Sequence, residues 1–97
     1  MIYELRFAVS ALKEWKKLDT FHRGIFKKKL SERLIEPRVP ADALRGLKDC
    51  YKIKLRSSGL RLVYRVDDRV ITVTVLAVGR RDGSEVYTTA ARRLGKD

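Results

Sequence analysis

Apolar and polar residues alternate along two neighbouring stretches in the middle of the chain, 51–56 and 60–66. Side chains on a β-strand point alternately to opposite faces, so each stretch is predicted to be a strand with one apolar face. Residues 57–59 are predicted to join the two strands as a hairpin. With both apolar faces toward the core, Leu55 lies near Leu60 and Lys54 near Arg61. The apolar positions are Tyr51, Ile53, Leu55, Leu60, Leu62, Tyr64 and Val66.

Periodicity elsewhere predicts two more strands and three helices. Alternation over 3–7 indicates a first strand, and apolar residues on both faces of 70–78 are typical of an inner strand. Helical spacing predicts a helix over 11–18 with Ser10 as its candidate N-cap, and Asp19 and Thr20 restart a second helix to Ile35, where Pro37 prevents further continuation. Ser84 is expected to cap a last helix through Leu94. The predicted fold is α+β, ordered β-α-α-β-β-β-α, with a small antiparallel-rich sheet packed by an N-terminal helical hairpin.

Two apolar stripes should anchor the helical hairpin to the sheet. The residues expected on them are Leu12, Trp15 and Leu18 in the first helix, and Phe21, Ile25, Leu30 and Leu34 in the second. Leu44 and Leu47 are expected to hold the intervening loop, 37–49, against the core.

Length and charge narrow the functional classes. The chain has 97 residues, so we expect a single domain spanning 1–97, and its 23 Lys and Arg against 12 Asp and Glu give a net charge of +11. Such a charge is typical of a nucleic-acid binder or of a protein with an acidic partner. No helix combines a basic face with the broad apolar face of a membrane-surface helix, and no apolar run is long enough to span a bilayer. The first seven residues are too charged for a secretory signal, so a cytoplasmic protein is expected.

Few residues are available to bind a metal or form a disulfide. The chain has one cysteine, Cys50, and one histidine, His22, too few for an internal disulfide or a zinc site. We therefore expect no metal and no cofactor. Cys50 is expected to be a small buried residue beside the site, and His22 to lie on the second helix without a catalytic role.

The polar face of the hairpin carries only basic residues. Like charges that face each other across a strand pair repel, so this face indicates a polyanionic partner. Its members are Lys52, Lys54, Arg56, Arg61 and Arg65.

All of these residues except Arg65 lie within segments that are similar to the RelE family of bacterial toxins, the toxic halves of type II toxin–antitoxin pairs. The resemblance covers nearly the whole chain and is most specific over 49–64. The matching segments are 11–18, 27–30, 44–46, 49–59, 61–64, Val78-Gly79, Arg81 and 84–87. It implies a fold similar to that of small microbial ribonucleases.

The resemblance also implies a ribosome-dependent endoribonuclease that cuts mRNA in the ribosomal A site. The cut would leave a 2′,3′-cyclic phosphate upstream and a 5′-hydroxyl downstream. Arg80 stands where lysine is frequent in the family, a departure that touches none of the five positions below. The five positions that match the family's catalytic and mRNA-orienting residues are Lys52, Lys54, Arg61, Arg81 and Tyr87.

Attack by a 2′-hydroxyl needs a base, charge to stabilise the phosphorane and an acid for the leaving oxygen. Lys52 and Lys54 suit gripping phosphate and sugar groups, and a lysine among other cations could act as the base. The planar fork of Arg61 suits the scissile phosphate. Arg81 suits the leaving group, although arginine releases a proton with difficulty. Tyr87 could take the 2′-proton, stack on a base, or simply pack in a stripe with Ala90, Ala91 and Leu94.

Further basic residues are candidates for RNA contacts. Arg45 matches a family position that contacts RNA. The basic helices could contact ribosomal RNA, or they could simply be solvated surface. The candidates outside the five catalytic positions are Arg45, Arg56, Arg65, Lys13, Lys16, Lys17, Lys27 and Lys28.

The resemblance implies an acidic RelB-like antitoxin that wraps the toxin and blocks its entry into the ribosome. Contact with operator DNA is expected only through the antitoxin. Two other functions remain open: a non-enzymatic blocker of the ribosomal A site, and a gyrase poison, as some toxins of this fold are. Retention of all five positions favours the RNA-cleaving branch.

Overall fold

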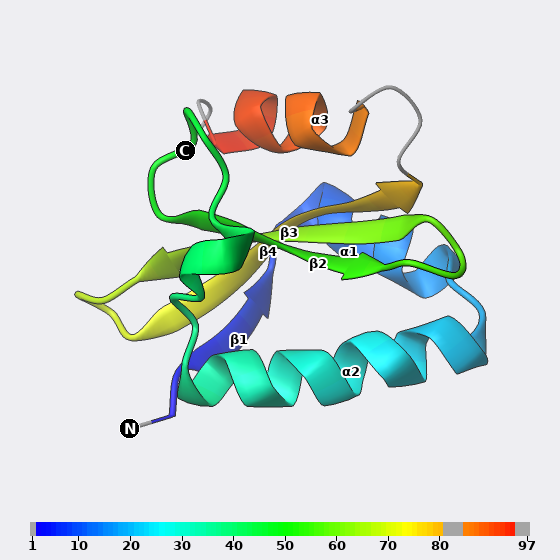
Figure 1. Cartoon of the computed structure of the whole chain (residues 1–97), viewed down its shortest axis with the longest axis horizontal. Coiled ribbons are helices and arrows are strands. Elements are labelled where there is room, and N and C mark those ends of the chain that lie inside the picture. Colours follow the sequence, from blue (N-terminus) through cyan, green and yellow to red (C-terminus); the bar gives the residue numbers. More distant parts are fainter. Residues whose placement is uncertain (1, 81–84, 95–97) are drawn as a thin grey trace.

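Helices and a mixed sheet make up the computed structural model, which describes residues 2–80 and 85–94 (Figure 1). A one-turn 3-10 helix, η1, spans Pro40–Asp42. The other elements, in chain order, are β1 (Glu4–Phe7), α1 (Val9–Lys17), α2 (Thr20–Ile35), β2 (Cys50–Leu55), β3 (Leu60–Asp67), β4 (Thr72–Arg80) and α3 (Glu85–Leu94). This order confirms the α+β prediction. Within the described ranges, no helix is long and apolar enough to cross a bilayer.

The sheet has the strand order β1-β4-β3-β2. The β2–β3 and β3–β4 pairs are antiparallel, whereas β1 runs parallel to β4. The hairpin register is the predicted one, with Lys54 opposite Arg61 and Leu55 opposite Leu60. β4 is the inner strand expected from its two apolar faces. It begins at Thr72 rather than at residue 70, because the chain turns at Ile71, where φ is 51°.

Helices cover both faces of the sheet. α1 and α2 pack on the face that carries Ile53, Leu62 and Tyr64, and they contribute the fully buried Ala11 and Phe26. On the opposite face, α3 closes a smaller cluster made by Cys50, Val63, Leu76, Ala77, Val86 and Ala90. Figure 1 shows α2 and α3 on opposite sides of the sheet. Both faces of β4 are therefore in a core, which explains its continuous apolar sequence.

Some predicted helix details differ from the structure. Ser10 lies inside α1, and Ala8 takes the N-cap position without a side-chain bond. Asp19 caps α2, accepting a hydrogen bond from the backbone N–H of His22 at 3.3 Å. The predicted buried stripes are shorter than expected, because Leu12 is 37% exposed and Phe21 is 70% exposed. Leu12 lies in the first turn of α1 and Phe21 in the first turn of α2.

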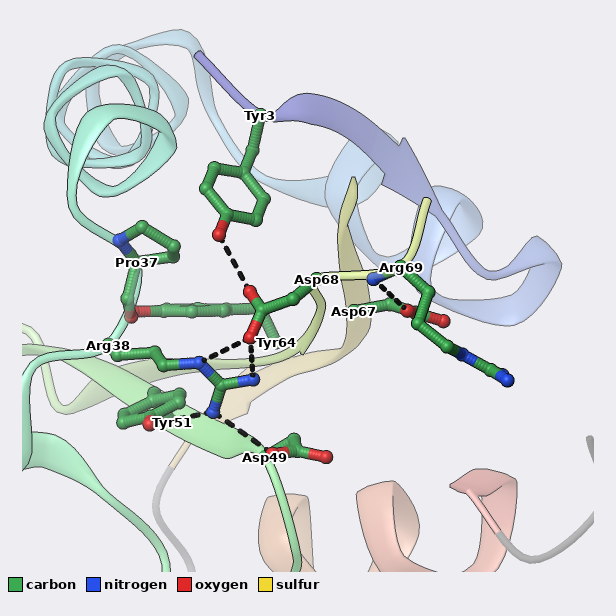
Figure 2. A network of polar contacts seen from close by, with 9 residues as sticks. All are labelled: Tyr3, Pro37, Arg38, Asp49, Tyr51, Tyr64, Asp67, Asp68 and Arg69. Atoms are coloured by element: carbon green, nitrogen blue, oxygen red, sulfur yellow. Dashed lines mark hydrogen bonds and ion pairs between the residues drawn. The ribbon is translucent and has the colours of Figure 1, made fainter. Parts of the chain in front are cut away.

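Arg38 fixes the loop that leads from α2 into β2. Its guanidinium donates to Asp49 at 2.9 Å and to Asp68 at 2.8 Å. The Tyr3 hydroxyl donates to the other oxygen of the Asp68 carboxylate at 2.6 Å, so this carboxylate joins the start of the chain, the loop and the β3–β4 turn (Figure 2). Hydrogen bonds from Tyr3 and Arg38 hold the pKa of Asp68 below its usual range.

A second arginine, Arg33 of α2, is half-enclosed beneath the same loop. It donates to the Tyr64 hydroxyl at 2.8 Å and to Asp42 of η1 at 2.6 Å. The Tyr64 hydroxyl in turn donates to the Pro37 carbonyl at 2.7 Å. These bonds satisfy a tyrosine that is 0% exposed and attach η1 to the sheet.

Candidate active site

A basic groove lies at the hairpin end of the sheet. Its volume is about 550 Å³, and its walls come from the end of β2, the hairpin turn, the start of β3 and the end of β4. Its basic lining residues are Lys54, Arg56, Arg61 and Arg80, and its polar floor includes Ser57 and Ser58. A groove of this size lined by cations is suited to a phosphate-bearing strand rather than to an apolar ligand.

Arg61 and Tyr87 meet at the edge of this groove. The guanidinium of Arg61 on β3 donates a hydrogen bond to the Tyr87 hydroxyl on α3 at 2.5 Å. The same guanidinium carbon lies 5.6 Å from the centre of the tyrosine ring. Tyr87 is half-buried and also packs against the smaller core. It therefore packs on the apolar stripe of the last helix, as one prediction held, and also has its hydroxyl at Arg61, as the catalytic prediction requires. Ala91, expected on that stripe, is exposed.

The lysine positions share the face of Arg61. Lys54 is the direct cross-strand neighbour of Arg61, and Lys52 lies two residues earlier, opposite Val63. Alternation therefore places Lys52, Lys54 and Arg61 on the α3 side of the sheet. Among residues 2–80 and 85–94, no carboxylate forms an ion pair with any of these three side chains.

Arg65 and Arg45 lie on the α3 side but away from the groove. Arg65 is the cross-strand neighbour of Cys50, at the far end of the hairpin from Lys54. Cys50 is buried as predicted, and burial raises the pKa of its thiol to about 11, so the thiol stays protonated near neutral pH. Arg45 is an exposed residue of the loop whose Leu44 and Leu47 pack against the α3 cluster, as expected for these two leucines.

The basic residues of the helices do not join the groove. The side chains are exposed on α1 and α2, which cover the opposite face of the sheet. This second basic surface comprises Lys13, Lys16, Lys17, Lys27 and Lys28. His22 lies at the start of α2, bound to Asp19 through Nδ1 at 2.5 Å.

The structure adds Arg80 to the groove. Arg80 lies opposite Leu60 at the end of β4 and donates to the Ser58 carbonyl at 3.1 Å. Its place in the groove was not predicted, because it depends on the β3–β4 register. Arg81, the remaining predicted catalytic residue, lies outside the described residues, as does the predicted cap Ser84.

Comparison with known proteins decides the family. The family model described as the ParE toxin of the type II toxin–antitoxin system parDE matches residues 5–84. The mRNA interferase toxin RelE of Escherichia coli K12 is 55% identical over 94 residues, covering 97% of this chain and 99% of its own. The chain belongs to the RelE/ParE family of type II toxins.

Solved RelE structures agree with this fold. A mutant of E. coli RelE in the free state superposes with a TM-score of 0.90 at 54% identity, covering 97% of this chain and 99% of the other. RelE in the intact E. coli RelBE toxin–antitoxin complex superposes with a TM-score of 0.81 at 55% identity, covering 82% of this chain and 98% of the other. The sheet and its covering helices are therefore those of the RelE toxins.

Proposed function

We propose that this chain is an mRNA interferase that cuts mRNA in the ribosomal A site. The observation that carries the proposal is the Arg61–Tyr87 pair, set beside Lys54 in a groove whose described lining residues include no carboxylate. The 55% identity to an mRNA interferase over nearly the full length supports the same reaction.

The proposed reaction is an attack of the 2′-oxygen on the adjacent phosphorus. The P–O bond to the 5′-oxygen breaks, which leaves a 2′,3′-cyclic phosphate and a 5′-hydroxyl. Arg61 is suited to the scissile phosphate, because a guanidinium can donate to two oxygens of the crowded phosphorane at once. Tyr87 is suited to the 2′-hydroxyl, because its own hydroxyl lies beside the Arg61 guanidinium that would hold the scissile phosphate.

The remaining roles concern substrate grip and the leaving group. Lys52 and Lys54 are separated by about 7 Å along one strand face, a spacing that suits successive sugar and phosphate groups. Arg56 borders the same groove and extends the grip. Arg81 is assigned to the leaving oxygen on the family resemblance alone, and Arg45 and Arg65 to outer RNA contacts.

Dependence on the ribosome follows from the chemistry of this groove. Among the described residues, the groove is lined by no histidine or carboxylate that could move protons. Weak acid–base groups require a substrate already held in line. We propose that the second basic surface, on α1 and α2, binds ribosomal RNA phosphates and orients the groove toward the A-site codon.

The proposed partners are the ribosome, mRNA and an acidic RelB-like antitoxin. The solved RelBE complex supports an antitoxin of this type, and the net charge of +11 favours an acidic one. Operator DNA would be contacted only through the antitoxin. Translating ribosomes place the proposed activity in the cytoplasm.

The test is primer extension on ribosomes carrying a defined A-site codon. The wild-type chain should cut within that codon and leave a 5′-end that accepts phosphate from a kinase without prior phosphatase treatment. Arg61→Ala should abolish the cut, whereas Arg69→Ala, which removes an exposed arginine from the β3–β4 turn, should leave it unchanged. Equal cutting of naked mRNA would refute ribosome dependence.

Two other outcomes would replace the proposal. Stalled ribosomes without cut message would indicate a non-enzymatic A-site blocker. The family model that matches this chain is named for ParE, so a DNA supercoiling assay with gyrase is the second control. Inhibition of gyrase together with intact message would indicate a gyrase poison.

A further inference from the structure

The edge of β4 is only partly covered by β1. The parallel pairing ends where Phe7 meets Val75, after which the Ala8 N–H donates to the Val75 carbonyl and the chain enters α1. Within residues 2–80 and 85–94, no strand pairs with the remainder of β4, up to Arg80, on that side. Backbone groups on such an edge need other partners when they lie under helices.

Two charged side chains, Glu14 and Arg93, close this edge. Arg93 of α3 donates to both carboxylate oxygens of Glu14 on α1, at 2.9 and 3.0 Å. Arg93 also donates to the Leu76 carbonyl at 2.7 Å, and Glu14 accepts from the Val78 N–H at 3.0 Å. The pair therefore satisfies two backbone groups of β4 and joins helices whose paired residues are 79 positions apart.

Polar contacts attach α3 to the rest of the molecule at both ends. Tyr87 in its first half bonds to Arg61, and Arg93 in its last turn bonds to Glu14 and Leu76. Among the described residues, the buried apolar side chains of α3 are those of Val86 and Ala90, and Tyr87 and Leu94 pack partly against the same cluster. So small an apolar contact allows α3 to shift unless the polar attachment at its far end holds it.

We propose that Glu14 and Arg93 are positioning residues that hold α3 on the sheet, so that the Tyr87 hydroxyl stays at Arg61. This inference rests on the proposed function, because holding α3 in place matters for cleavage only if the Tyr87–Arg61 contact takes part in it. The pair acts through Tyr87 and touches no substrate. The contacts of this pair are directional, because the Arg93 guanidinium donates to the Leu76 carbonyl while the Glu14 carboxylate accepts from the Val78 N–H. They therefore prevent α3 from sliding along β4 and also hold it close to the sheet.

The first test is a double-mutant cycle on single-turnover cleavage of ribosome-bound mRNA. Arg93→Met should lower the cleavage rate about tenfold, because a displaced catalytic group loses its alignment. In a Tyr87→Phe background, the same change should have less than about a twofold further effect, whereas in a Lys54→Ala background it should keep its full effect. The control is Arg92→Met, an exposed neighbour of the same charge, which should cleave like the wild type.

The second test does not depend on cleavage. Amide hydrogen exchange of the free protein should show faster exchange across α3 in Arg93→Met, while β2 and β3 keep their protection. Glu14→Gln should give a smaller change, because an amide oxygen still accepts from Val78. The proposal would be overturned if the losses of cleavage rate caused by Arg93→Met and Tyr87→Phe simply multiplied in the double variant. It would also be overturned if amide exchange in α3 were unaltered in Arg93→Met. An inactive wild-type chain with the expected exchange pattern would count against the proposed function and in favour of the constraint.

Discussion

Two arginine–tyrosine pairs in this molecule have nearly the same geometry and different surroundings. Arg33 donates to the Tyr64 hydroxyl at 2.8 Å with its guanidinium carbon 5.8 Å from the ring centre. Arg61 donates to the Tyr87 hydroxyl at 2.5 Å with the corresponding distance at 5.6 Å. One pair lies between α2 and the sheet, and the other lies between the sheet and α3.

The difference lies in what else each pair touches. The Arg33 charge is balanced by Asp42, and the Tyr64 hydroxyl is used by the Pro37 carbonyl, so that pair has no capacity left for a ligand. Arg61 has no carboxylate partner among the described residues, and it faces a groove. The same two side chains thus stabilise the fold in one place and remain available for an anion in the other. Neutralisation decides between the two roles.

The largest effect expected from this comparison is on catalysis. Arg61→Ala should reduce cleavage by on the order of 10³-fold, because one preorganised donor to a developing charge is lost. The thermal midpoint should stay within a few degrees, since no buried carboxylate is left unpaired. Single-turnover cleavage and thermal unfolding of the same preparation measure both. A collapse of the midpoint would make Arg61 a structural residue like Arg33.

Removing the Tyr87 hydroxyl should reduce activity, whereas removing the Tyr64 hydroxyl should reduce stability. Tyr87→Phe should lower the cleavage rate by about 100-fold with little change in stability, as expected for loss of a group that moves a proton. Tyr64→Phe should leave cleavage by the folded protein unchanged and destabilise it by about 1–2 kcal/mol, because the Pro37 carbonyl loses its donor. Urea unfolding and cleavage assays on both variants check this, and equal losses of activity would contradict it.

Breaking the ion pair between Arg33 and Asp42 should lower the stability of the fold and leave the cleavage activity unchanged. Arg33→Met leaves Asp42 without its partner in a half-buried position, and we expect a loss of about 2 kcal/mol in unfolding free energy. Replacing both partners, Arg33→Met with Asp42→Leu, should recover part of that loss, because no unpaired charge remains. Urea denaturation of the single and double variants gives the comparison. A double variant no more stable than the single one would contradict it.

The smallest expected effect is a pH dependence at the alkaline end. Burial raises the pKa of Tyr64 above 10.0, despite the lowering influence of Arg33. The unfolded chain then loses this proton more readily than the folded one, so stability should be constant below about pH 10 and decline above it. Tyr64→Phe should make this decline shallower in urea unfolding followed from pH 8 to 11. An identical decline in both proteins would remove Tyr64 as its cause.

The sequence was sufficient wherever one local rule decided the outcome. Strict alternation over 51–56 and 60–66 determined the hairpin register, and therefore that Lys54 faces Arg61. The apolar sequence on both faces of 70–78 correctly indicated an inner strand. These features depend on residues close together along the chain.

The features that were missed depend on distant residues. Nothing near Glu14 indicates that it binds Arg93, and nothing near Asp42 singles out Arg33 as its partner, because exposed and paired charges have the same local pattern. Arg80 reaches the groove only through the β3–β4 register, which contains a bulge at Val63/Tyr64. Helical periodicity placed Phe21 on a packed stripe because it reports only direction around the helix, not whether the sheet extends that far.

The parallel pairing of β1 with β4 also sets the order in which the toxin can mature. Glu4 emerges from its own ribosome early but finds its register partner, Thr72, only after most of the chain has been made. Contacts between residues so far apart form late and slowly. The sheet therefore stays open, and the groove lacks its β4 wall, until residues 72–80 have been made. The topology thus delays assembly of the proposed active groove to a late stage of synthesis.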